Sequence, residues 1–250
     1  MRFTLFFLWA TMLNFACLSQ NPQDSTFRPR WYIGTDALIR QESFRLDDPN
    51  GQIVPSDWMW NVSYGGNVGL HIKPSLTLET GLYRFTYANR LHMSNTFGFL
   101  NRSSLRPFSG LSIPIRAYMD PFARSSHRFR RTQVQLMGGF SWVFMAFESD
   151  RKSVFQIKDP SSASGSSDLV VSTAGLVNRH GFNLEGGLNA TYTFSNNLAL
   201  SMSYGYIIGL QTMLNREINY RRRSFDPMSK ANQSSLGSGD MWLVGLKFKL

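Results

Sequence analysis

The sequence lacks several features that define whole classes of proteins. It has a single cysteine, Cys17, in 250 residues, so no disulfide scaffold or cysteine-ligated metal site is expected once a leader containing Cys17 is removed. After residue 20 there is no run of the roughly 18 apolar residues that a membrane-spanning helix needs. The four histidines stand apart, at positions 71, 92, 127 and 180. We therefore expect no metal and no cofactor.

Acidic residues are also scarce. The chain has 16 Asp and Glu against 26 Lys and Arg, a formal net charge of +10. The basic residues form neither a helical stripe nor an RNA-binding strand motif, so no nucleic-acid partner is expected. They lie mostly between the predicted strands, which in an exported chain favours contact with anionic lipid headgroups or acidic partners.

Residues 1–19 have the pattern of a secretory signal peptide. Arg2 gives the positive start, Phe3 to Phe15 form the apolar core, and small residues precede a cut ahead of Gln20. We predict a signal peptide at 1–19, a short periplasmic segment at 20–29 and one barrel domain at 30–250. Lipidation of Cys17 stays open, although Asn14 stands where lipoprotein signals usually carry leucine.

Residues 198–211 show the clearest pattern in the chain. Every even position from Leu198 to Leu210 is apolar, and the odd positions, except Ile207, are small or polar. Because side chains alternate along a strand, one face is apolar throughout. The segment is about twice as long as an ordinary soluble strand of five or six residues, and a tilted strand of this length crosses a bilayer.

Seven further segments repeat this alternation, which gives eight predicted strands. They are residues 31–40, 58–72, 76–88, 111–119, 132–147, 180–194, 198–211 and 241–250. Short turns join the second strand to the third and the sixth to the seventh. The connections at 41–57, 89–110, 148–179 and 214–240 are long. The prediction is an all-β fold, an eight-stranded antiparallel up-and-down transmembrane β-barrel with short periplasmic turns and long extracellular loops.

Two segments depart from this pattern. The leucines in the first half of 76–88 share one face, whereas Tyr83, Phe85 and Tyr87 fall on the other, and a β-bulge would explain the change. The connection at 120–131 should be a short inner turn, yet it is long and rich in arginine.

A soluble sandwich or lipocalin-like barrel would show the same alternation with its apolar face turned inward. Strand length, glycine-rich small faces and aromatic residues near the strand ends favour the membrane, where aromatic girdles mark the two interfaces. The direction in which the apolar face points decides between the two folds.

The chain resembles the small eight-stranded outer-membrane barrels of Gram-negative bacteria, in the style of Bacteroidetes proteins that include PorT-like barrels. The resemblance covers residues 30–250. It is carried by the signal followed by Gln20, by Leu-Glu-Thr-Gly-Leu at 78–82, by Leu-Ser-Ile-Pro-Ile at 111–115 and by the amphipathic last strand. It implies export to the outer membrane with a cleaved signal peptide. It also implies a non-enzymatic role among outer-membrane lipid and lipopolysaccharide, or an accessory role in a type IX protein-secretion apparatus.

Charged residues on the small faces are expected to form a network inside the barrel. Eight strands enclose a space that side chains fill, and buried charges need partners there. We predict pairs between Glu79 and Arg116 and between Lys247 and Asp36, with a narrow ion path as the open alternative. The predicted network consists of Asp36, Glu79, Arg116, Glu185, Lys247 and Lys249.

Arginines in the connections are the predicted binding residues. Those of the last long loop suit lipopolysaccharide phosphates, because a guanidinium binds phosphate through two hydrogen bonds; they are Arg216, Arg221, Arg222 and Arg223. Those of the inner connection suit an acidic periplasmic or secretion-system partner; they are Arg124, Arg128, Arg130 and Arg131.

One short motif raises a catalytic alternative. His92-Met93-Ser94-Asn95 resembles the His-x-Ser-Asn of outer-membrane lipid A deacylases, in which a histidine activates a serine. In that family the motif comes late in the chain and an acidic residue follows it, whereas residues 95–115 here contain no Asp or Glu. We therefore predict no catalytic residues, with a lipid A-modifying hydrolase as the remaining alternative.

Overall fold

The computed structural model describes residues 29–50, 53–54, 60–87, 90–94, 100–104, 108–123, 131–146, 151–158, 167–221 and 227–250. The predicted signal peptide, and all but the last residue of the predicted periplasmic segment, lie outside these residues. In the described part of the chain, no helix is long and apolar enough to cross a membrane.

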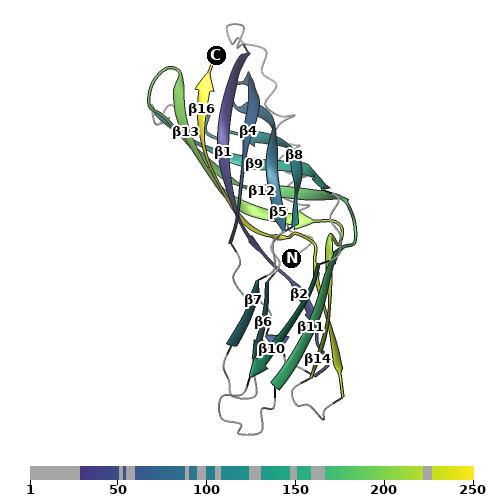
Figure 1. Cartoon of the computed structure of the whole chain (residues 1–250). Coiled ribbons are helices and arrows are strands. Elements are labelled where there is room, and N and C mark those ends of the chain that lie inside the picture. Colours follow the sequence, from purple (N-terminus) through teal and green to yellow (C-terminus); the bar gives the residue numbers. More distant parts are fainter. Residues whose placement is uncertain are drawn as a thin grey trace.

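Eight strands close into a barrel (Figure 1). They are β1 (Arg30–Glu42), β4 (Trp60–Lys73), β5 (Leu76–Tyr87), β8 (Phe108–Met119), β9 (Thr132–Met145), β12 (His180–Thr193), β13 (Leu198–Gly209) and β16 (Gly239–Lys249). Neighbours are antiparallel throughout, and β1 closes the ring by pairing with β16. The eight predicted strands correspond to these in order, so the predicted fold class is confirmed.

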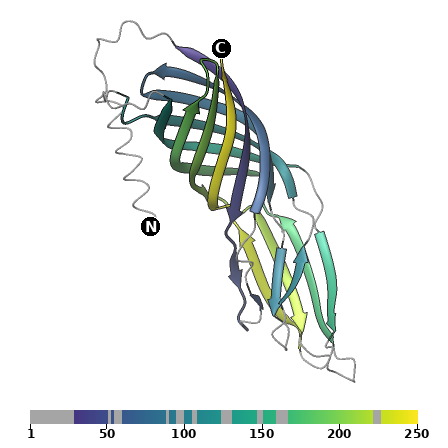
Figure 2. The same ribbon diagram turned by 90° about the vertical axis from the view of Figure 1, so that its left-hand side faces the viewer.

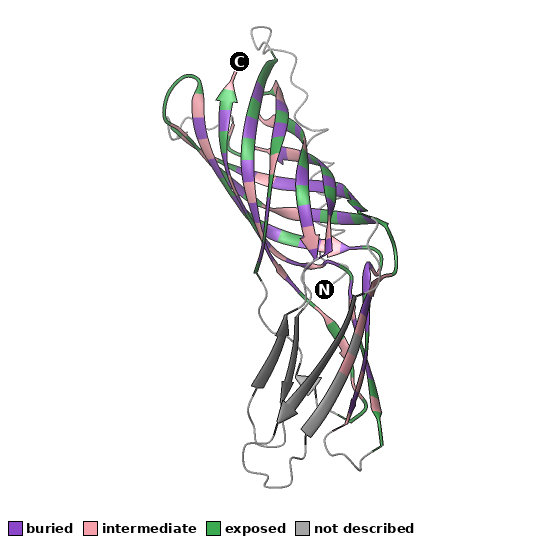
Figure 3. Cartoon of the chain, viewed as in Figure 1, coloured by how far each residue is buried: buried purple, intermediate pink, exposed green. Residues whose placement is uncertain are grey.

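The apolar side of the barrel wall points outward. Burial alternates along each barrel strand (Figure 3). In β13, Ser201 and Ser203 are buried, whereas Met202 is 49% and Tyr204 48% exposed. The same belt continues on the other strands with Val62, Leu82, Ile113, Phe140, Leu188 and Leu246. A soluble barrel would place these residues inside, so the outward face is one that lipid covers.

β5 has no bulge at the position that the sequence pattern favoured. Its register with β8 has a constant offset, from Leu76 opposite Met119 to Tyr87 opposite Phe108. Tyr83 and the two aromatic residues that follow it on the same face point inward and are at most 1% exposed. They are large because they fill the lumen. The register shift involving β5 lies at the other end of its pairing with β4, between His71 and Lys73.

The long connections contain strands, which corrects the prediction of loops. β10 (Arg151–Lys158), β11 (Ser167–Leu176), β14 (Leu214–Arg221), β15 (Ser229–Ser235) and β2 (Arg45–Asp47) form a five-stranded sheet. β3 (Ile53–Val54), β6 (Arg90–Ser94) and β7 (Leu100–Ser104) form a three-stranded sheet. Both sheets lie beyond the barrel end that is opposite the C-terminus (Figure 2). We call them the extension, and we call the barrel end with the C-terminus the terminal end.

The barrel and the extension share one apolar core. Phe85, Tyr87 and Phe108 come from barrel strands, whereas Ala174 and Leu214 come from the extension, and all of them are buried in one cluster. The cluster also includes Val143, Met145 and Met213. The extension is therefore packed on the barrel through buried side chains, in addition to its covalent connections.

The outward belt predicts how the barrel tolerates charge. Leu188→Arg places a guanidinium in the middle of the belt, where Leu188 is 54% exposed. We expect a loss of about 2–4 kcal/mol in the free energy of unfolding, because Arg at the bilayer midplane costs that much. Urea unfolding in phospholipid vesicles measures it. Asn215→Arg, at an exposed position of β14, is the matched control and should change stability by no more than about 0.5 kcal/mol. If Leu188→Arg left the free energy of unfolding unchanged, this would contradict the outward orientation of the apolar belt.

Candidate functional site in the lumen and the extension

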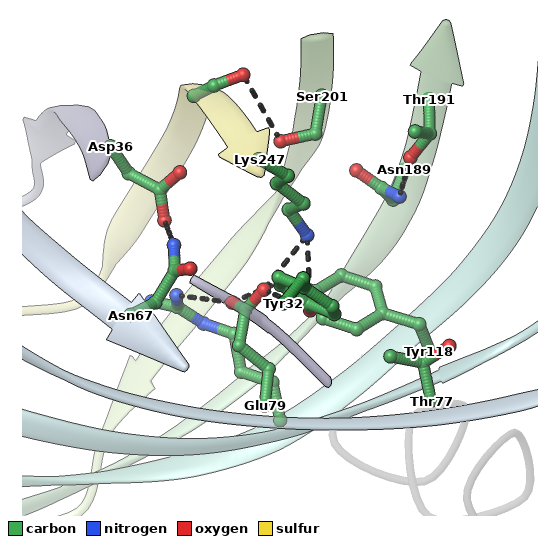
Figure 4. Close-up of polar contacts among 12 residues, drawn as sticks. Tyr32, Asp36, Asn67, Thr77, Glu79, Tyr118, Asn189, Thr191, Ser201 and Lys247 are labelled. Carbon is green, nitrogen blue, oxygen red and sulfur yellow. Dashed lines mark hydrogen bonds and ion pairs between the residues drawn. The ribbon is translucent and has the colours of Figure 1, made fainter. Parts of the chain in front are cut away.

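Glu79 is the centre of a polar network in the lumen (Figure 4). It is 3% exposed. Its Oε2 accepts hydrogen bonds from the Tyr32 hydroxyl at 2.6 Å and from Lys247 Nζ at 2.8 Å. Its Oε1 accepts from the Tyr118 hydroxyl at 2.9 Å and from Arg116 Nη1 at 3.5 Å. Four donors from three other strands therefore converge on one carboxylate.

Arg116 extends the network across the barrel. Its Nε donates to Glu185 Oε2 at 2.7 Å, and its Nη1 donates to the Tyr83 hydroxyl at 3.1 Å. The Tyr83 hydroxyl in turn donates to Asp36 Oδ2 at 2.5 Å. Asn67 Nδ2 donates to the same Asp36 oxygen. The network thus links β1, β4, β5, β8, β12 and β16 through side chains.

Glycines in the neighbouring strands make room for these large side chains. A Cβ on Gly69 would lie 2.0 Å from the Tyr32 ring. A Cβ on Gly139 would lie 3.1 Å from Arg116 Cγ and 2.5 Å from the Ile115 carbonyl oxygen. The small inward faces seen in the sequence are therefore the space that the polar side chains occupy.

The predicted pairs form in part. Glu79 and Arg116 are cross-strand partners and contact each other, as expected. Lys247 pairs with Glu79, which corrects the expected Lys247–Asp36 pair. The register explains the difference: Lys247 lies opposite Gly34, one inward position closer to the terminal end than Asp36. The Asp36 carboxylate accepts from Asn67 and Tyr83 instead.

A small cavity lies between the network and the terminal end of the barrel. Its volume is about 50 Å³, enough for a few water molecules. The predicted network residue Lys249 lines this cavity together with Lys247, His71 and Gln135. Lys249 is half-buried there.

Apolar side chains and a second ion pair fill more of the lumen. Two tyrosines of the network share a buried cluster with apolar residues from other strands; the cluster consists of Leu38, Tyr83, Tyr118, Met137, Ile207, Met241 and Leu243. Towards the extension, Arg40 and Glu42 form a buried ion pair. The Arg40 guanidinium also lies 3.9 Å from the centre of the Phe85 ring, within cation–π range. The lumen is therefore filled by paired and packed side chains along its length.

The arginines predicted to bind partners lie in different surroundings. Arg216 is 0% exposed and sits in β14, which corrects its placement in a solvated loop. Arg221 ends β14 half-buried, and Arg131 is exposed just before β9. The remaining predicted arginines lie outside the described residues; they are Arg124, Arg128, Arg130, Arg222 and Arg223.

The described residues form no candidate metal site. Within them, no group of three or more His, Cys, Asp or Glu side chains could hold a metal ion. The backbone of His92 and Ser94 lies in β6 of the extension, whereas Asn95 and the side chains of this motif lie outside what the structure describes.

No family model and no curated protein matches the chain. Among solved structures, the outer membrane protein OprG from Pseudomonas aeruginosa is similar, with a TM-score of 0.51 and 10% identity over 88% of this chain and 95% of that one. The chain has the fold of a small outer-membrane barrel. Two other solved structures match as well. E. coli Outer Membrane Protein W has a TM-score of 0.42 and 9% identity over 90% of this chain and 100% of that one. A major outer membrane protein from Thermus thermophilus has a TM-score of 0.40 and 10% identity over 90% of this chain and 100% of that one. Identity this low carries the fold and no residue roles.

The network predicts a large cost for removing its central charge. Glu79→Gln removes the carboxylate that pairs with Lys247 and one of the two that pair with Arg116. We expect a loss of about 3–5 kcal/mol in the free energy of unfolding, as for other broken buried pairs. Equilibrium urea unfolding in detergent micelles measures it. Glu217→Gln, on the exposed face of β14, is the control and should be nearly neutral. Equal small effects of both changes would show that the network contributes little stability.

Proposed function

We propose that this chain is a non-enzymatic outer-membrane protein whose barrel anchors the extension outside the cell, where the extension binds other molecules. The observation that carries this proposal is the contrast between the two parts. The lumen is occupied by paired and packed side chains, whereas the extension is built of ordered strands that share a core with the barrel.

The short turns and the chain ends support the proposed orientation of the barrel. The Leu250 N–H donates to the Trp31 carbonyl at 3.0 Å, so the beginning and the end of the barrel meet at the terminal end. The short turns after β4 and β12 lie at the same end. In outer-membrane barrels the short turns are periplasmic and the long connections are outside. The extension is then extracellular.

The outward apolar belt of the barrel supports a location in the outer membrane. Exposed aromatic side chains stand near the strand ends, as expected of interfacial girdles; they include Trp31, Trp60, Tyr192, Phe194, Trp242 and Phe248. The surroundings that we propose are outer-membrane lipid and lipopolysaccharide, with Arg221, Arg222 and Arg223 beside lipopolysaccharide phosphates. Export with a cleaved signal peptide at residues 1–19 belongs to the same proposal.

A second candidate is an accessory role in a protein-secretion apparatus of the type IX kind, as the resemblance to PorT-like barrels implies. One observation favours it: Arg131, in the basic 120–131 connection at the terminal end, is exposed. This role requires a periplasmic partner with an acidic surface. Photo-cross-linking from position 131 tests it, and recovery of only background proteins would count against it. Nothing in the described residues favours the lipid A-modifying hydrolase.

Lysine labelling of intact cells tests location and orientation together. Lys230 is exposed in β15 of the extension, and Lys73 is exposed at the turn between β4 and β5. A membrane-impermeant amine reagent should modify Lys230 in intact cells and should modify Lys73 only after the outer membrane is broken. Peptide mass spectrometry reads out both sites. Modification of Lys73 in intact cells would contradict the proposed orientation, and failure to label Lys230 would contradict display at the cell surface.

Conductance tests the filled lumen. The purified protein in planar lipid bilayers should give no steady unitary current, because eight strands leave an interior that side chains fill. A sixteen-stranded porin in the same bilayers is the positive control. Reproducible unitary currents that Leu38→Gly alters would show an ion path through the lumen.

A further inference from the structure

Arg216 is buried without a hydrogen-bond partner among the residues that the structure describes. It lies on the inner face of β14, is 0% exposed, and none of its three guanidinium nitrogens has a hydrogen-bond partner. Its cross-strand neighbours are Ala174 of β11 and Gln233 of β15. Gln233 is 2% exposed, and its Nε2 also lacks an acceptor. Two neighbouring side chains therefore present buried N–H donors that no acceptor of the described residues meets.

This arrangement departs from how the chain treats its other fully buried arginines. Arg116 pairs with Glu79 and Glu185, and Arg40 pairs with Glu42. Arg216 is the only fully buried arginine of the described residues for which no ion pair forms.

Among the described residues, no carboxylate pairs with Arg216. Ala174 and Leu214 on one side belong to the apolar core, and Ile218, the next inward residue of β14, is also fully buried. The adjacent Glu217 is exposed on the opposite face of the strand. Burial lowers the pKa of Arg216 to about 10, so the group is still a cation at neutral pH. A buried cation without a counterion is costly, and so is each unsatisfied donor.

We propose that Arg216 and Gln233 bind a small oxyanion, a carboxylate or phosphate with at least two oxygen atoms. The planar guanidinium donates two parallel hydrogen bonds to such a group, which is the geometry that carboxylate and phosphate both match. The Gln233 amide adds a third donor from the neighbouring strand. The apolar residues around the pair exclude water and strengthen each of these bonds. This site goes beyond the anchoring role proposed above and does not depend on the lumen being closed.

Equilibrium dialysis of the full mature chain in detergent micelles tests the site with radiolabelled inorganic phosphate and, separately, acetate. We expect saturable binding of about one anion per chain by at least one probe, and the probe that binds more tightly identifies the preferred class of anion. Arg216→Met should lower the affinity about tenfold or more, since hydrogen bonds to a charged group are lost. Gln233→Leu should lower it less. Arg45→Gln, at an exposed position of β2 in the same sheet, is the control and should leave the affinity unchanged.

Thermal unfolding distinguishes a bound anion from a partner within the chain. In buffer containing only chloride, Arg216→Met should be at least as stable as the unchanged protein, because it removes an uncompensated buried charge. Adding phosphate or acetate at constant ionic strength should raise the melting temperature of the unchanged protein but not of Arg216→Met.

Three results would overturn the proposal. They are the absence of saturable binding of either anion, equal loss of binding in Arg45→Gln, and a marked destabilisation by Arg216→Met in chloride, which would reveal an internal carboxylate partner. If Arg216→Met does not fold, dialysis of the unchanged protein and of Arg216→Lys decides. These results are independent of lysine labelling, so a failure of the anchoring role remains distinguishable from a failure of the anion site.

Discussion

A lipid-covered wall requires that every backbone N–H and C=O pair within the sheet, and a closed ring of strands meets this requirement. The eight antiparallel strands do so without an edge. Closure then fixes the side chains, because alternate positions must face either lipid or a narrow lumen. Large apolar residues such as Leu188 lie outside, and small residues such as Gly69 lie inside, where they leave space for a tyrosine or an arginine. The polar network depends on that space.

The network and the extension follow the same rule that a buried charge needs a partner. In the lumen, Glu79 satisfies Lys247 and Arg116, and Glu185 satisfies Arg116 from the far side. Breaking one of these contacts leaves a charge where water cannot reach it, which is why such pairs hold strands in register even when their net stabilisation is modest. Arg216 lies in an equally buried position without a carboxylate among the described residues, and this contrast is the basis for proposing an anion as its partner.

The barrel was predictable from sequence because its signal is a period of two repeated along the chain. Strand order and the Glu79–Arg116 contact follow from that period and from the short turns. The outward direction of the apolar face follows from strand length, the glycine-rich small faces and the aromatic residues near the strand ends, because the period alone fits a soluble barrel equally well. β14 was missed because Arg216 interrupts its apolar face, so this segment was interpreted as part of a basic loop. The partner of Lys247 was missed because it depends on how far a flexible side chain reaches along the barrel axis. The aromatic residues of β5 looked like a break in the alternation because they are large and face inward. They fill the lumen, and the pattern of one strand does not show how much space the lumen has there.

The central claim is that the apolar faces of the barrel strands contact lipid. Nitroxide labels on single cysteines test it directly, after the native Cys17 is replaced by serine. Labels at Leu188 and Met202 on the outward face, with the inward Ser203 as the reference, are compared for collision with oxygen and with a water-soluble nickel chelate in lipid vesicles. The account predicts high oxygen and low nickel accessibility at both outward positions, with low oxygen accessibility at Ser203. High oxygen accessibility at Ser203, with low oxygen or high nickel accessibility at Leu188 and Met202, would contradict it.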